Sequence, residues 1–290
     1  MEDTNLLLDI YRDFIVRFTD NNRTQSRFFR YGLDYQNFKN PLLEYSGKVF
    51  SQSDEDGITF EILRRIGIDK GTFVEFGVGN GLENNTLSLL ARDWKGVWFG
   101  TGQQLGFDLN PNNITDLNFN VYDSWVTKDN IVNLIETGLG CIRETNIDVI
   151  SMDLDGNDYY FIKEILETGY NPSVFIAEYN GKFMPPIKFT IDYDENFHWN
   201  GDDYNGASLS LLNELFNKHD YTLVACNISG VNAFFVKNEY LSAFEDIPRE
   251  IEKLFNSPKF FVGCLDVWGH WNSVDGKTKV IENIIKRVNS

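Results

Sequence analysis

The sequence predicts an α/β fold, a three-layer Rossmann-like arrangement around a mostly parallel sheet that ends in an antiparallel hairpin. Two observations carry this prediction. From about residue 71, short apolar runs alternate with amphipathic helical patterns, which is typical of parallel strands joined by crossover helices. The last two apolar runs, 221–227 and 232–237, are joined by only four residues, and so short a link favours a hairpin.

Helical patterns are expected on both sides of the sheet domain, which we place at residues 71–240. Residues 1–70 form an N-terminal helical extension, and residues 241–290 form a C-terminal one that packs on the same domain. Within the first extension, residues 51–67 combine helical spacing with acids in the first turn and Gly67 at the end.

The elements of the sheet domain follow from the same periodicities. The other five strands are expected at 72–76, 96–100, 117–122, 147–154 and 173–179. Helices are expected at 83–92, 128–135, 159–168 and 208–219.

Charge and cysteine content limit the partners and the compartment. With 26 basic and 43 acidic side chains, the net charge is -17, so the chain should repel nucleic acids and anionic membranes. No stretch reaches the roughly 18 apolar residues that a membrane-spanning helix needs. The acidic, amphipathic start does not resemble a secretory signal, and Cys141, Cys226 and Cys264 are odd in number and widely spaced. We therefore expect a cytoplasmic protein.

The segment VEFGVGNGLE, residues 74–83, is the sharpest local signal. An apolar strand ends near Glu75, and Gly77, Gly79 and Gly81 lead into a helix, so bare backbone can approach a ligand. The spacing differs from that of dinucleotide and P-loop sites. An acid beside the loop would repel a pyrophosphate but suit the ammonium group of S-adenosylmethionine, which we predict as cofactor. A ligand-free turn is the alternative.

Several longer segments resemble the FkbM-type S-adenosylmethionine-dependent methyltransferases, many of which act on sugars or related natural products. The matching segments are SQSDEDGI (51–58), FVEFGVGNGLENNT (73–86), WKGVWFG (94–100), MDLDGNDYY (152–160), FIAEYN (175–180), YNGASLSLL (204–212) and GVNAFFVK (230–237). The resemblance implies the seven-stranded class I methyltransferase sheet, with Gln52 near the cofactor.

One position departs from this resemblance. Gly100 stands where the similar sequences carry an Asp that binds the ribose hydroxyls. Either Gln103, Gln104 or Asp108 replaces that acid, or cofactor binding is weak or lost. Asp123, at the end of the third strand, could receive the adenine amino group, or it could be a solvated loop residue.

Acidic side chains follow the fourth and fifth predicted strands, and their carboxyl ends face the same crevice as the glycine loop. Because converging carboxylates repel one another unless a proton or cation lies among them, we predict a divalent-cation site, with Mg²⁺ preferred. The arrangement resembles that of metal-dependent O-methyltransferases, which hold the ion with an acid after strand four and an acid–amide pair after strand five. By this resemblance the candidate ligands are Asp153, Glu178 and Asn180, and Asp153 also borders the cofactor site. Asp155 is an alternative ligand. Alternatively, Asn157 or Asp158 only caps the following helix, and Asp155 begins a turn.

A hydroxyl acceptor must lose a proton when it is methylated, to a base or through a metal. His198, in an aromatic and acidic loop after the fifth strand, and Asp155 are the candidate catalytic residues. The sequence thus predicts an O-methyltransferase for a small hydroxylated acceptor such as a sugar or glycan precursor, and it leaves oligomerisation open. The alternatives are a pseudoenzyme that acts as a binding protein and a metal-dependent enzyme of other chemistry.

Overall fold

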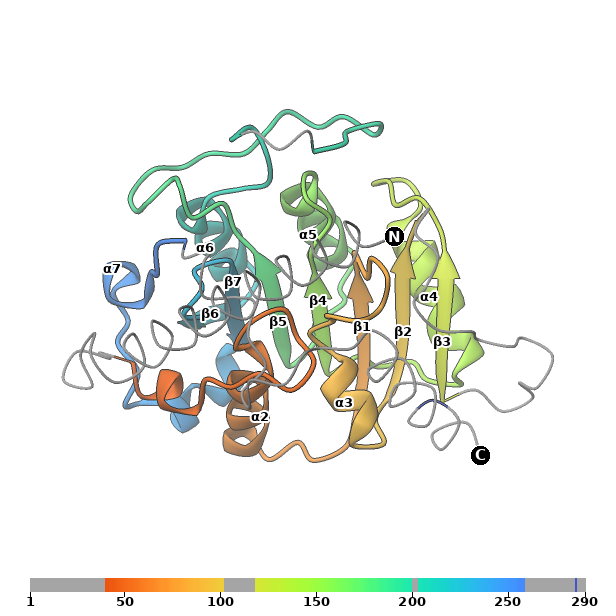
Figure 1. The fold of residues 1–290 in the computed structure, drawn as a ribbon, viewed down its shortest axis with the longest axis horizontal. Helices are drawn as coiled ribbons and strands as arrows, with labels where there is room; N and C mark the ends of the chain where they lie inside the picture. The colour runs from red at the N-terminus through yellow and green to blue at the C-terminus, as the bar shows by residue number, and fades with distance from the viewer. Residues whose placement is uncertain (1–39, 102–117, 200–202, 259–284, 286–290) are drawn as a thin grey trace, which may run out of the picture.

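The computed structural model describes residues 40–101, 118–199, 203–258 and residue 285. Seven strands form one sheet in the order β3-β2-β1-β4-β5-β7-β6 (Figure 1). The strands are β1 (Thr72–Phe76), β2 (Lys95–Gly100), β3 (Phe119–Asp123), β4 (Val149–Met152), β5 (Val174–Glu178), β6 (Tyr221–Cys226) and β7 (Asn232–Lys237).

Strand directions confirm the predicted fold class. The pairs β1–β2, β1–β4, β2–β3 and β4–β5 are parallel, whereas β7 runs antiparallel between β5 and β6. A mostly parallel sheet in this order, with one antiparallel strand inserted before the edge, is the class I methyltransferase topology. Its topological switch lies between β1 and β4, where open α/β sheets bind ligands at the carboxyl edge.

Helices cover both faces of the sheet and complete the three layers. α2 and α3 lie on one face, and α4, α5 and α6 lie on the other (Figure 1). The bounds are α2 (Glu55–Ile66), α3 (Leu87–Ala91), α4 (Ile131–Cys141), α5 (Asp158–Glu167) and α6 (Leu209–Lys218). Strands β1 and β4 are buried along their whole length, which explains why their sequences are mostly apolar.

Two helices differ in length from the prediction. α3 begins only at Leu87, because the carboxylate of Glu75 accepts hydrogen bonds from the backbone N–H groups of Asn85 and Thr86 and keeps the preceding loop non-helical. α4 extends past residue 135 and includes Gly138, where a Cβ atom would lie 2.8 Å from a methyl carbon of Val97 on β2. The glycine therefore lets the helix pack closely on the sheet.

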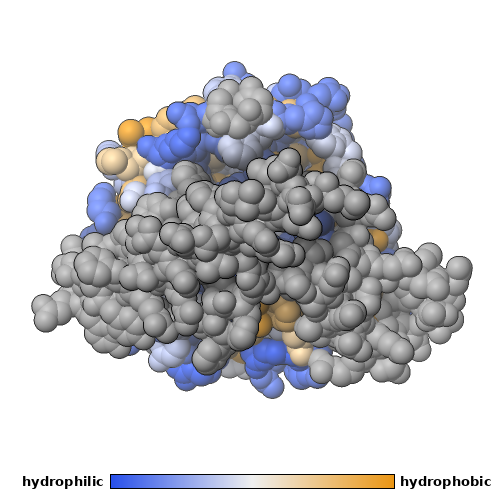
Figure 2. Space-filling view, in the orientation of Figure 1, coloured by the Kyte–Doolittle hydropathy of each residue, from blue (hydrophilic) through white to orange (hydrophobic). Residues whose placement is uncertain are grey.

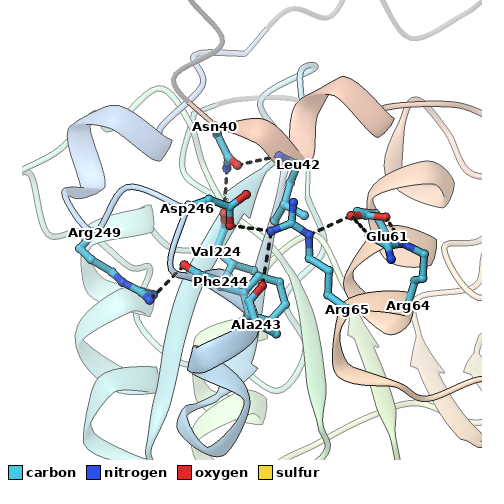
Figure 3. Close-up of polar contacts among 10 residues, drawn as sticks. All are labelled: Asn40, Leu42, Glu61, Arg64, Arg65, Val224, Ala243, Phe244, Asp246 and Arg249. Carbon is cyan, nitrogen blue, oxygen red and sulfur yellow. Dashed lines mark hydrogen bonds and ion pairs between the residues drawn. The ribbon is translucent and has the colours of Figure 1, made fainter.

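The described parts of the two extensions pack against the sheet domain. They contain the short helices η1 (Pro41–Tyr45), η3 (Asn238–Phe244) and α7 (Ile251–Leu254). Asn40 donates to the carbonyl of Val224 on β6 (2.7 Å), and Arg65 of α2 bridges Glu61 and Asp246 (Figure 3). The helical patterns expected in residues 1–39 and 259–290 lie outside the described residues, except for residue 285.

Gly67 ends α2 as expected, in the left-handed conformation with φ of 75°. Hydrophilic residues predominate among the coloured residues along the upper edge of the molecule (Figure 2). None of the helices in the described ranges has the length and apolar character needed to cross a bilayer.

Candidate functional site

A cavity of about 450 Å³ opens at the carboxyl edge of β1, β4 and β5 and at the start of β7. The glycine loop after β1, the acidic turn after β4 and the segment after β5 form its wall. Among the described residues that line it, Lys182 is the only basic one. Five are acidic: Glu75, Glu83, Asp153, Asp155 and Glu178. The cavity therefore suits a ligand that carries hydrogen-bond donors or positive charge.

The three glycines of the loop adopt positive φ angles, 86° at Gly77, 50° at Gly79 and 79° at Gly81. A Cβ atom on Gly77 would lie 1.4 Å from the carbonyl oxygen of Asp153, so this glycine lets the loop cross the end of β4. Gly77 and Gly79 line the cavity, whereas Gly81 closes a turn by donating to the carbonyl of Val78 (2.8 Å). The loop thus presents backbone to the cavity, as expected from the sequence.

Glu75 reaches from β1 to the wall of the cavity and also holds the loop. Its carboxylate accepts from the N–H groups of Asn85 (2.8 Å) and Thr86 (3.1 Å) and from the Thr86 hydroxyl (2.5 Å). Burial raises the pKa of Glu75 to about 7 despite these donors. This structural role is not evident from the sequence, because the acceptor and its donors are ten or more residues apart.

The structure brings together Asp153, Asp155 and Glu178, and one carboxylate oxygen from each lies within 4.8 Å of the other two. Burial, followed by the charge of the neighbouring carboxylates, raises the pKa of Asp153 and of Glu178 well above the ordinary values. Asp155 is the exposed member and has a φ of 58°. This group could hold a metal ion, since hard divalent cations prefer clustered oxygen ligands.

Asp158 and Asn157 shape the acidic turn. The Asp158 carboxylate accepts from the N–H groups of Leu154 (2.8 Å) and Gly156 (2.9 Å), both in the turn before α5. Asn157 occupies the N-cap position of α5 but makes no side-chain capping bond. Its amide nitrogen instead donates to the carbonyl of Asp194 (2.7 Å), so of the two residues that the sequence offers as a cap, Asn157 does not cap the helix with its side chain. This contact fixes the segment after β5 to the turn.

Asn180 lines the cavity, but its amide serves the loop that follows β5. Its nitrogen donates to the carbonyl of Asp203 (3.1 Å) and to the side-chain oxygen of Asn205 (2.6 Å). Its oxygen accepts from the N–H of Lys182 (3.2 Å). The amide that the sequence places in the metal site is thus already hydrogen-bonded at both ends.

The remaining predicted site residues fall in different places. Gln52 lines the cavity, whereas His198 and Asp123 are exposed residues outside its described lining. The rings of His198 and Trp125 form a T-shaped pair with their centroids 4.8 Å apart, while the next residue, Trp199, lines the cavity. The roles predicted for His198 and Asp123 stay predictions.

Side-chain amides are the functional feature that sequence reasoning largely missed. Seven line the cavity: Gln52, Asn80, Asn84, Asn85, Asn180, Asn205 and Asn232. Asn84 and Asn232 are 4% and 3% exposed, and the Oδ1 atom of each has no hydrogen-bond donor among the described residues. A buried acceptor without a donor is energetically unfavourable, so a ligand that donates to these two oxygens would be stabilised in the cavity. The ENNT sequence after the glycines was the only local hint.

Gly100 ends β2 beside the glycine loop. A Cβ atom there would lie 2.8 Å from the Cγ2 atom of Val78, so the valine side chain occupies space that an acidic side chain at position 100 would need. In register, Gly100 is paired with Asp123 on β3. The replacements suggested by the sequence, Gln103, Gln104 and Asp108, lie outside the described residues.

No protein-family model matches this chain, and no curated protein proves similar to it in sequence. The resemblance to FkbM-type enzymes therefore stays a prediction. What stands is the class I methyltransferase-like fold, which suggests an S-adenosylmethionine-dependent enzyme, together with an acidic group placed to hold a metal.

Proposed function

We propose that this protein is an S-adenosylmethionine-dependent O-methyltransferase whose acceptor is a small hydroxylated molecule such as a sugar or glycan precursor. One observation carries the proposal: the polar cavity lies at the carboxyl edge of a class I methyltransferase sheet, between the glycine loop and an acidic cluster. A dinucleotide or nucleoside triphosphate would bring several negative charges to a wall that is already acidic.

The residues around the glycine loop fit the methionine end of this cofactor. The side chain of Asn84 interacts with the carboxyl group of Glu75 and lowers its pKa, as a donor does, so the amide nitrogen faces Glu75. Its Oδ1 atom is left as a buried acceptor, suited to an ammonium group. When bound, the cofactor supplies an electrophilic methyl group, and the role of this chain is to hold and orient it.

The other wall of the cavity suits a hydroxyl-rich acceptor. Side-chain amides such as those of Asn80 and Asn205 offer both donors and acceptors to hydroxyl groups. Trp199, 48% exposed and in the cavity lining, can cover the apolar face of a sugar ring. Asp155, the most accessible carboxylate of the cluster, can take the hydroxyl proton, and partial desolvation raises its pKa, which makes it a better base.

Thermal unfolding with and without S-adenosylmethionine tests the cofactor. At a concentration one hundred times the Kd, we expect the Tm to rise by about 5 °C, because only the native state binds. Asn84→Ala should require about tenfold more cofactor for the same shift, since it removes one buried acceptor. Asn217→Ala, on the exposed surface of α6, is the matched control and should behave as the wild type. An unchanged Tm of the wild-type protein would contradict cofactor use.

A second candidate is a binding protein that has lost cofactor affinity. A Cβ atom at residue 100 would lie 2.8 Å from the Cγ2 atom of Val78, so an acid at this position would require the valine to move. This close approach favours the second candidate. This candidate predicts a folded protein whose Tm does not respond to the cofactor but does respond to a hydroxylated ligand of the cavity.

A further inference from the structure

Asn232 is the first residue of β7 and lies directly opposite Glu178, the last residue of β5, in the antiparallel register. Residues that face each other across an antiparallel pair project to the same side of the sheet, with Cβ atoms about 5 Å apart. Both residues line the cavity. Asn232 therefore lies beside the carboxylate group formed by Asp153, Asp155 and Glu178.

The orientation of the Asn232 amide is fixed by a buried acid on another element. Its nitrogen donates to the carboxylate of Glu55 (3.1 Å), at the start of α2. A carboxylate acceptor requires the NH₂ group on that side, so Oδ1 is directed away from Glu55. In the described part of the chain no group donates to this oxygen, although the residue is only 3% exposed. A buried carbonyl oxygen without a donor is costly unless a ligand reaches it.

We propose that the side-chain oxygen of Asn232 and the carboxylates of Asp153, Asp155 and Glu178 form a binding site for one hard divalent cation such as Mg²⁺. A cation satisfies the three mutually repelling carboxylates and the orphaned amide oxygen together. A neutral donor molecule such as water would satisfy the amide but would bring no positive charge to the carboxylates.

Asn180, the amide suggested by the sequence, is not part of this set. Both ends of its amide are hydrogen-bonded within the loop after β5, so binding a cation would break contacts that hold the loop. Asn232 can bind without any such loss. The site also needs no cofactor, so it can be tested apart from the proposed methyl transfer.

The test is a titration of the chelator-treated, full-length protein with Mn²⁺ alone, followed by the electron paramagnetic resonance signal of the free ion. We expect one ion per wild-type chain. Asn232→Ala should raise the Kd about tenfold, in the range found when a single metal-site contact is removed. Asn180→Ala is the matched control and should stay within about twofold of the wild type, given that it supplies no ligand.

Asn232→Ala is expected to fold, because Glu55 keeps hydrogen bonds from Ser53 and Asn227; circular dichroism checks this. If the variant does not fold, the wild-type titration still decides, and Asp153→Asn should abolish binding. A wild-type protein that binds no Mn²⁺ overturns the site. So does a pattern in which Asn180→Ala weakens binding and folded Asn232→Ala does not.

Discussion

Glu75 illustrates how one buried carboxylate can serve both the fold and the cavity. It is 3% exposed, and its oxygens accept from the backbone of Asn85 and Thr86. Desolvation outweighs these hydrogen bonds, so the pKa of Glu75 rises from 4.5 to about 7. Near neutral pH the group is divided between its two protonation states.

This pKa shift predicts a pH dependence of stability. Between pH 4.5 and about 7 the folded Glu75 holds a proton that the unfolded chain releases. Its contribution to the free energy of unfolding is therefore complete below pH 4.5 and is lost as the pH rises through 7. When the pH is raised from 5 to 7.5, the free energy of unfolding of the wild type should fall by about 2 kcal/mol more than that of Glu75→Gln, because glutamine has no proton to release.

Urea unfolding at the two pH values measures this difference. Glu136→Gln, on an exposed position of α4, is the control and should follow the wild type. Equal pH dependence in Glu75→Gln and in the wild type would show that Glu75 is already ionised in the folded protein.

At the scale of elements, the meeting of the glycine loop with the end of β4 positions the site. The loop passes so close to the carbonyl of Asp153 that residue 77 has no room for a side chain. This crossing sets the acidic turn beside the loop, and the contact of Asn157 with Asp194 fixes the segment after β5 to the same turn. The cavity is therefore a product of three loops that hold one another.

Two glycines give a matched test of that crossing. Gly77→Ala should lower the free energy of unfolding by more than about 3 kcal/mol, because it combines a backbone clash with a strained φ. Gly140→Ala, in α4 with nothing within 4 Å of the added carbon, should be neutral or up to about 1 kcal/mol stabilising. Urea denaturation compares the two, and similar stabilities for both variants would contradict the close approach.

At the scale of the whole molecule, the net charge of -17 acts on the folded state as self-repulsion. The acidic cluster adds to it at one edge of the sheet. The same excess of acid makes the cavity suited to ligands that carry positive charge or hydrogen-bond donors.

Screening should therefore stabilise this protein. Raising NaCl from 20 mM to about 300 mM, with a chelator present to remove divalent ions, shortens the Debye length from about 20 Å to about 6 Å. We expect the Tm to rise by about 2 °C or more, measured by differential scanning calorimetry at pH 7.5. A fall in the Tm would mean that attractive ion pairs, such as that of Arg65 with Asp246, outweigh the repulsion.

The sequence by itself determined the class of fold and the edge where the site lies. Apolar runs gave the strands, a four-residue link gave the hairpin, and the order of glycines and acids after the strands placed both at one edge. These features are local in the chain, and periodicity reports local structure well.

Only the tertiary structure decided which polar atoms are left for a ligand. The amide of Asn180 is hydrogen-bonded within its own loop. Asn232 lies opposite Glu178 because β7 inserts next to β5, and its nitrogen donates to Glu55, 177 residues away, so its oxygen is directed away from Glu55. Likewise, Glu75 is tied to the start of α3. The physical reason is that an acceptor is free or satisfied according to which distant donors the fold brings to it, and no local pattern records those partners.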